Sequence, residues 1–253
     1  MMSNFVITFS PTGGTKRVAK ILADSLGCDS FIDLTKRNGD FASYSFTADD
    51  FCIVAVPSYG GRVPQIAAER LRCMKGNGAK AVVVAVFGNR AIEDTLVELL
   101  DVLSEASFTC IAAMEAVAEH SIVREVAAGR PDADDVVDLQ NAAKQIAAVL
   151  AEGKSTAPEV PGNRPYKDLG VIPLKPIAGA GCVACGICAM VCPVGAIDII
   201  DASKTDADAC INCMSCVSAC SYSARVVNED TYNMLAAKLK SLCADRKPVK
   251  LYL

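Results

Sequence analysis

Cys182-Val-Ala-Cys-Gly-Ile-Cys-Ala-Met-Val-Cys-Pro193 is repeated in outline by Cys210-Ile-Asn-Cys-Met-Ser-Cys-Val-Ser-Ala-Cys-Ser221. Both runs have the spacing C-x2-C-x2-C-x3-C, and together they hold eight of the 13 cysteines of the 253-residue chain. The repeat has an offset of 28 residues and continues into Ala196-Ile-Asp-Ile and Ala224-Arg-Val-Val, which we expect to form matching strands. Neither half is large enough to bury a face alone, so the repeat predicts one small module with approximate two-fold symmetry.

This spacing is typical of cysteines that bind two [4Fe–4S] clusters, and the fourth cysteine of each run then binds the cluster of the other run. Paired C-x2-C elements can also bind zinc, but three cysteines at two-residue intervals with a fourth beyond them, present twice, favour cubane clusters. Ser221 stands where the second run usually has proline; proline is not a ligand, so we expect cluster assembly to survive. The predicted ligands are Cys182, Cys185, Cys188 and Cys220 for one cluster, and Cys210, Cys213, Cys216 and Cys192 for the other.

Composition narrows the class of protein. The net charge is −4, and acidic and basic residues are mixed along the chain, which argues against a nucleic-acid partner. No apolar run approaches the length of a membrane-spanning helix, and Phe5–Phe9 is too short for a secretory signal. Because the cysteine spacing is of the metal-binding type, we expect a reducing, cytoplasmic location. Five cysteines lack such spacing and are expected to act as small apolar residues: Cys28, Cys52, Cys73, Cys110 and Cys243.

A second candidate site lies near the N-terminus. The apolar run 5–9 predicts a buried strand, and apolar spacing over 16–26 predicts a helix. Between them lies Ser10-Pro-Thr-Gly-Gly-Thr15, whose backbone amides would face an anion at the helix N-terminus, with hydroxyls from Ser10, Thr12 and Thr15 and close approach at Gly13 and Gly14. The triphosphate and dinucleotide motifs are absent, so the loop suits a monophosphate such as that of FMN.

Strands and helices continue to alternate, which predicts an α/β fold with a doubly wound, five-stranded parallel sheet. Ligands of such sheets bind beyond the carboxyl ends of the strands. The expected later strands are 30–34, 51–56, 79–87 and 108–117. The expected later helices are one that follows Pro64 and runs through Arg72, and two more at 91–105 and 132–152.

Two further loops follow strands at this edge. The first loop, Pro57-Ser58-Tyr59-Gly60-Gly61, contains an aromatic side chain that could stack on a planar ring, next to glycines that let the ring approach the backbone closely. The second loop, Phe87-Gly88-Asn89-Arg90, could form hydrogen bonds to a planar heterocycle. His120, the single histidine, follows the fifth strand; we expect it to titrate near neutrality and do not assign it a catalytic role.

With these loops and the cysteine runs, the chain resembles the flavodoxin–ferredoxin fusion electron-transfer proteins. The resemblance implies FMN phosphate at Ser10–Thr15, ring contacts from Pro57–Gly61 and Phe87–Arg90, and a ferredoxin-type module with two [4Fe–4S] clusters. Many flavodoxins stack a Trp on the flavin; this chain has none, which leaves stacking to Tyr59. The expected organisation is an FMN domain at 1–152, a proline-rich linker at 153–179, the cluster domain at 180–230, and a C-terminal helix and tail at 231–253.

The predicted function is electron transfer between FMN and the two clusters, with unidentified redox proteins as partners. A flavin-dependent reductase of a small acceptor is the alternative, but Glu119 and His120 are the only acid–base candidates near the flavin loops. A sensor module that has lost its flavin is the third possibility. An electron carrier is favoured over a substrate-specific oxidoreductase.

Overall fold

The computed structural model describes residues 3–170 and 172–253. Its first part alternates strands and helices, and its last third consists of short elements and one longer helix. The elements are β1 (Asn4–Thr8), α1 (Gly14–Leu26), β2 (Ser30–Asp33), β3 (Phe51–Pro57), α2 (Gln65–Arg72), β4 (Lys80–Phe87), α3 (Thr95–Glu105), β5 (Thr109–Val117), α4 (Ala133–Ala151), β6 (Ile177–Ala178), α5 (Ile187–Met190), α6 (Ser215–Ser218), β7 (Arg225–Val226), α7 (Glu229–Leu242) and β8 (Lys250–Tyr252), with a 3-10 turn at Phe41–Ser43.

The large sheet has the strand order β2-β1-β3-β4-β5-β8. Its first five strands are parallel, and their order is that of flavodoxin-like doubly wound sheets. The predicted fold class is therefore confirmed. The sheet gains a sixth strand, because β8 at the C-terminus pairs antiparallel with β5.

Both faces of the sheet are covered, as the continuous apolar strands require. One core joins the sheet to α2 and α3 through residues such as Leu71 and Leu99. The other joins it to α1 and α4 through residues such as Leu22 and Ile146. The helix expected over 91–105 begins only at Thr95, because Glu93 has a positive φ of 45° that ends regular geometry before it.

The cysteine-rich module repeats itself in structure as it does in sequence. The one-turn helices α5 and α6 start 28 residues apart. Left-handed φ angles recur at the same offset, with 54° at Ala184 against 55° at Asn212, and 74° at Gly186 against 60° at Met214. The expected matching strands are short: β7 pairs with β6, and Ile197 forms a single bridge with Thr205.

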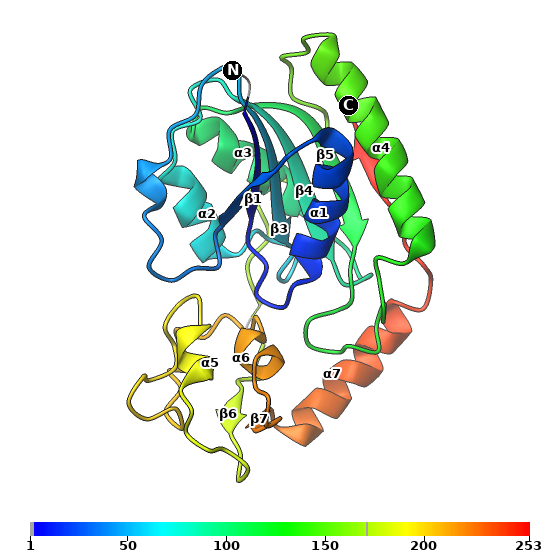
Figure 1. The fold of residues 1–253 in the computed structure, drawn as a ribbon. Coiled ribbons are helices and arrows are strands. Elements are labelled where there is room, and N and C mark those ends of the chain that lie inside the picture. The colour runs from blue at the N-terminus through cyan, green and yellow to red at the C-terminus, as the bar shows by residue number, and fades with distance from the viewer. Residues whose placement is uncertain (1–2, 171) are drawn as a thin grey trace.

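The module lies at the end of the large sheet, and α7 leads the chain back from it toward α4 (Figure 1). α7 packs on the loop after β5 through a small core that includes Val123, Val126 and Leu239. The expected linker runs along α3, where Asn163 donates to Asp94 and Arg164 pairs with Asp101; Val171 of that linker lies outside the described residues. The linker is thus held to the sheet domain.

None of the helices in the described residues has the length and apolar character needed to cross a bilayer.

Candidate cofactor sites

Two cavities lie in the cysteine-rich module. The first, here called the inner cavity, is lined by Cys192, Cys210, Cys213 and Cys216. The second, the outer cavity, is lined by Cys182, Cys185, Cys188 and Cys220. These are the two sets that the crossed ligand pattern predicts. In each set, three cysteines come from one run and the fourth from the other.

The surroundings of the sulfurs suit iron–sulfur clusters. The amide of Ala196 donates to Cys192 Sγ at 3.2 Å, and at the equivalent place the amide of Ala224 donates to Cys220 Sγ at 3.3 Å. Such donors stabilise thiolate ligands and tune a cluster. The Ala224 amide is the largest influence that lowers the pKa of Cys220.

Burial has the opposite effect deeper in the module and raises the pKa of Cys213 to about 12. A ligand must be deprotonated, so the buried thiolates need the positive charge of bound iron. No three Cys, His, Asp or Glu side chains in the described residues converge as ligands of a single ion would. Four sulfurs spaced around a cavity instead suit a ligand of several atoms, such as an iron–sulfur cluster.

The inner cavity lies against the sheet domain. Ile211 lines this cavity and also packs against the core formed with α2 and α3. Arg70 of α2 donates to the carbonyl of Pro193 at 2.7 Å, directly after Cys192, and to the carbonyl of Leu34. The outer cavity is bordered by Val183 and Tyr222, which are 54% and 60% exposed. One cysteine set therefore faces the sheet domain and the other faces solvent.

The expected phosphate loop has the form of an anion site. Gly13, at a left-handed φ of 90°, precedes α1, and the first amides of that helix, at Gly14 and Thr15, have no acceptor within the helix. Ser10 Oγ accepts from the amide of Lys16 at 2.9 Å, which leaves the hydroxyl proton free to donate. Thr12 is half-buried and Thr15 buried. The loop therefore suits a phosphate held by amides and hydroxyls.

The expected flavin loops meet at the carboxyl edge of the sheet. A Cβ on Gly61 would lie 1.9 Å from Glu93 Oε2, and one on Gly88 would lie 2.4 Å from His120 Cδ2. A Cβ on Gly14 would lie 3.2 Å from that of Ala118. The loops after β1, β3, β4 and β5 thus form one continuous row. The side chains of Glu93 and His120 lie so close to the backbone at positions 61 and 88 that only glycine fits there.

Several polar side chains expected at the flavin are engaged elsewhere. Ser58 Oγ is 2.7 Å from Thr95 Oγ1, and Arg90 pairs with Glu93 at 2.8 Å, which lowers the pKa of Glu93 to about 2. Phe87 is buried in the core formed with α2 and α3, Pro57 ends β3, and Gly60 has a φ of 61°. Ring contacts from these loops would therefore be made by backbone groups and by Tyr59.

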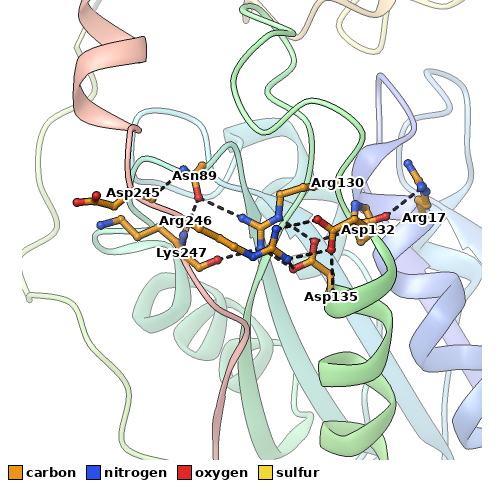
Figure 2. Close-up of polar contacts among 9 residues, drawn as sticks. Arg17, Asn89, Arg130, Asp132, Asp135, Asp245, Arg246 and Lys247 are labelled. Carbon is orange, nitrogen blue, oxygen red and sulfur yellow. Dashed lines mark hydrogen bonds and ion pairs between the residues drawn. The ribbon is translucent and has the colours of Figure 1, made fainter.

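Asn89 gives the clearest departure from expectation (Figure 2). Its Nδ2 donates to the carbonyls of Cys243 and Asp245, both at 2.9 Å. Its Oδ1 accepts from Arg130 Nη1 and from the amide of Lys247. The amide group is fully used, so the side chain holds the C-terminal segment instead of facing a ligand.

Tyr59 connects the two parts of the molecule. Tyr59 and Ile211 of the cysteine-rich module both pack against the core formed with α2 and α3. Burial raises the pKa of Tyr59 well above its usual value, and the neighbouring Cys213 raises it further. Tyr59 therefore stands between the flavin loops and the inner cavity.

His120 does not titrate near neutrality, contrary to expectation. Its Nδ1 accepts from the amides of Val123 at 3.0 Å and Ile122 at 3.2 Å, which places the proton of the neutral ring on Nε2. Burial, with a smaller contribution from the charge of Arg90, lowers the pKa of His120 to about 4. The ring is neutral at pH 7. Glu119 is paired with Arg124, so the two residues do not form an acid–base pair.

Sequence comparison identifies one family: residues 181–224 match the 4Fe-4S dicluster domain. No curated protein matches the chain in sequence.

Structure comparison finds flavodoxins over the first part of the chain. A short-chain flavodoxin associated with a bacterial microcompartment is 19% identical over 58% of this chain and 98% of its own, with a TM-score of 0.42. The flavodoxin of Streptococcus pneumonia TIGR4 is 23% identical over 58% and 99%, with a TM-score of 0.37. A flavodoxin from the domain Archaea is 12% identical over 59% and 99%, with a TM-score of 0.43.

Proposed function

We propose that this chain, a flavodoxin-like α/β domain followed by a 4Fe-4S dicluster domain, transfers electrons between FMN and two [4Fe–4S] clusters. The observation that carries the proposal is the pair of cavities, each lined by four cysteines, with the inner one beside Tyr59. Flavins exchange electrons singly or in pairs, whereas a [4Fe–4S] cluster exchanges them one at a time, and these properties belong to the cofactors. The protein sets their distance, potential and access to solvent.

The chain's own residues divide this work. The amides of Gly14 and Thr15 and the hydroxyl of Ser10 would hold the phosphate, and Tyr59 would pack on the ring. The eight cysteines of the two runs would bind iron. Arg70 joins the sheet domain to Pro193 and would fix the inner cluster relative to the flavin. Because electron-transfer rates fall steeply with distance, this contact matters for function.

The arrangement supports an order of transfer. The inner cavity is the one next to the flavin loops, and the outer cavity has Cys185, Val183 and Tyr222 exposed at its border. Electrons would then pass between the flavin loops and the inner set of cysteines, on to the outer set, and from there to a redox partner.

Anaerobic reconstitution tests the proposal. We expect one FMN and, for two cubanes, about eight irons per chain. Cys213→Ser should remove the inner cluster and stop reduction of the outer cluster from photoreduced FMN. Cys185→Ser should remove the outer cluster and leave reduction of the inner one intact. A folded, iron-loaded wild-type chain that binds no FMN would refute the flavin half of the proposal.

The reductase alternative has less support. It requires a proton donor at the flavin, and the two candidates, Glu119 and His120, are respectively paired with Arg124 and neutral. Steady turnover of a small acceptor at the flavin by Cys213→Ser protein would favour it. Measured flavin content separates both functions from a sensor without flavin.

A further inference from the structure

Arg225 is shared by the linings of the inner and outer cavities. It lies in β7 and is 3% exposed. The repeat makes it conspicuous: at the offset of 28, Ala224-Arg225 corresponds to Ala196-Ile197. Where the first half has an apolar side chain, the second half has a permanent positive charge between the two predicted clusters.

The guanidinium is held in place by neutral oxygens. Nη1 donates to the carbonyl of Ala202 at 2.8 Å, and Nη2 donates to the carbonyl of Pro176 at 2.9 Å and to Thr205 Oγ1 at 2.8 Å. Nε is buried and has no hydrogen-bond partner in the described part of the chain. A buried donor without an acceptor is costly and calls for a specific explanation.

The charge also lacks a counter-ion among the described residues, since its three partners are carbonyl and hydroxyl oxygens. A buried, unpaired cation is strongly unfavourable unless a negative group lies close by. Arg225 lines both cavities, so its charge lies beside the cysteines of both sets. Two clusters, each bound by four thiolates, would carry net negative charge and would supply both the counter-ion and acceptors for Nε.

We propose that Arg225 is an electrostatic tuning residue that raises the reduction potentials of both clusters and weakens the repulsion between electrons held on them. The inference rests on the proposed function. Each one-electron reduction adds one negative charge to a cluster without transferring an atom, and a fixed cation between the clusters favours both additions. The module would then accept an electron pair from a flavin more readily than two isolated clusters would.

A simpler role is structural: Arg225 joins the segments that carry Pro176, Ala202 and Thr205. That role explains three hydrogen bonds, but it requires neither the charge nor the unpartnered Nε. The two roles predict different results for a neutral side chain that can still form hydrogen bonds. Such a side chain would leave the cluster potentials unchanged if the role were structural, but would lower them if the charge of Arg225 tunes the clusters. Arg225→Gln keeps a donor and removes the charge, whereas Arg225→Lys keeps the charge and loses the fork of donors.

The test is an EPR-monitored redox titration of reconstituted wild-type, Arg225→Gln, Arg225→Lys and Arg225→Ile chains. Ile is included because Ile197 occupies the equivalent place in the first half. The matched control is Lys204→Met, which removes a cation of the same module that is 73% exposed and hence screened by solvent. Iron and sulfide per chain are measured for every variant.

In Arg225→Gln and Arg225→Ile we expect the equilibrium constant for reduction of each cluster to fall at least tenfold, or about 59 mV, and the two potentials to separate further. In Arg225→Lys the equilibrium constant for reduction of each cluster should stay within about threefold of wild type, or about 28 mV. In Lys204→Met both potentials should equal those of wild type. The proposal is overturned if Arg225→Gln leaves both potentials within threefold of wild type, if only one cluster responds, or if Lys204→Met has an equal effect. A wild-type chain that takes up fewer than two clusters would refute the proposed function itself.

A measurement on the unmodified chain covers the case in which the neutral variants do not assemble. Protein labelled with ¹⁵N-arginine is loaded with clusters, reduced and studied by pulsed EPR. A guanidinium that donates to a cluster should give a resolved ¹⁵N hyperfine coupling, which Arg225→Lys protein lacks. If wild type shows no such coupling, Nε does not face a cluster and the proposal fails.

Discussion

Asn89 Oδ1 accepts a hydrogen bond from Arg130 Nη1 at 3.2 Å, so the loop after β4 is joined to the loop after β5 inside the molecule. Arg130 is itself buried and paired with Asp135, Nε to Oδ2, at 2.8 Å. The C-terminal segment lies across this pair, with Arg246 bound to Asp132 at 2.7 Å and the carbonyl of Lys247 bound to Arg130 (Figure 2). The segment that returns from the cluster module is thus fastened beside the flavin loops.

Asn89→Ala tests the importance of this attachment. The substitution leaves the carbonyls of Cys243 and Asp245 and the amide of Lys247 without their partner, and we expect it to lower the free energy of unfolding by about 2–4 kcal/mol. Hydrogen exchange in β8 should accelerate, because that strand follows the released segment. Urea unfolding and mass-spectrometric exchange measure the two effects.

Asn77→Ala is the matched control. Asn77 also has a left-handed backbone, with a φ of 48° against 60° at Asn89, and its Nδ2 also makes two hydrogen bonds, to Ser45 and Phe46. Both variants replace asparagine, which tolerates the left-handed backbone, with alanine, which disfavours it. The backbone cost is therefore shared by the two variants. Equal exchange rates in β8 of the two variants would show that Asn89 does not hold the C-terminal segment.

Local patterns in the sequence predicted the sheet and the grouping of cysteines well. The parallel sheet followed from strands that alternate with helices, and the grouping of the cysteines into two crossed sets followed from the spacing of two short motifs. The role of Asn89 could not be predicted in this way, because its partners in the C-terminal segment are more than 150 residues away and Arg130 is 41 residues away. Arg225 was visible in the repeat as a charge opposite Ile197, but only its burial between two cavities gave that difference a meaning.

The contact between the sheet domain and the cysteine-rich module could not be predicted from local sequence patterns either. Arg70 looks like an ordinary surface residue of a short helix, yet its side chain reaches Pro193, 123 residues along the chain. The pKa of His120 depends on packing around its ring and on the nearby charge of Arg90, which a single histidine in a sequence does not reveal. Pairwise contacts between distant segments, and the burial they cause, are set by the assembled fold.

Gly88→Ala tests the contact between the loops after β4 and β5. An added Cβ would lie 2.4 Å from His120 Cδ2 and 2.7 Å from its Cβ, so one loop must move. We expect a loss of about 1–3 kcal/mol in unfolding free energy and weaker FMN binding. Gly170→Ala, where a Cβ meets nothing within 4 Å, should leave both unchanged. If Gly88→Ala behaves like this control, the two loops separate freely.

Tyr59→Leu tests the aromatic ring between the flavin loops and the inner cavity. Loss of stacking should weaken FMN binding about tenfold, which corresponds to about 1.4 kcal/mol. Fluorescence titration of the chain with FMN gives the affinity, and iron content should stay at the wild-type value. Tyr44→Leu, at a 37% exposed tyrosine outside these loops, is the control. An affinity within twofold of wild type would exclude Tyr59 as the stacking residue.

His120 predicts how stability depends on pH. Its pKa is lowered from 6.5 to about 4 in the folded chain, so the unfolded chain binds the additional proton between these values. The contribution of the neutral ring is therefore complete above pH 6.5 and is lost as the pH falls toward 4, by up to about 3 kcal/mol. His120→Gln cannot take up this proton, so its stability should fall less between pH 7 and pH 4.5 than that of wild type. Urea unfolding at several pH values measures the difference, and parallel curves for the two proteins would show that the ring is protonated equally in the folded and unfolded chains.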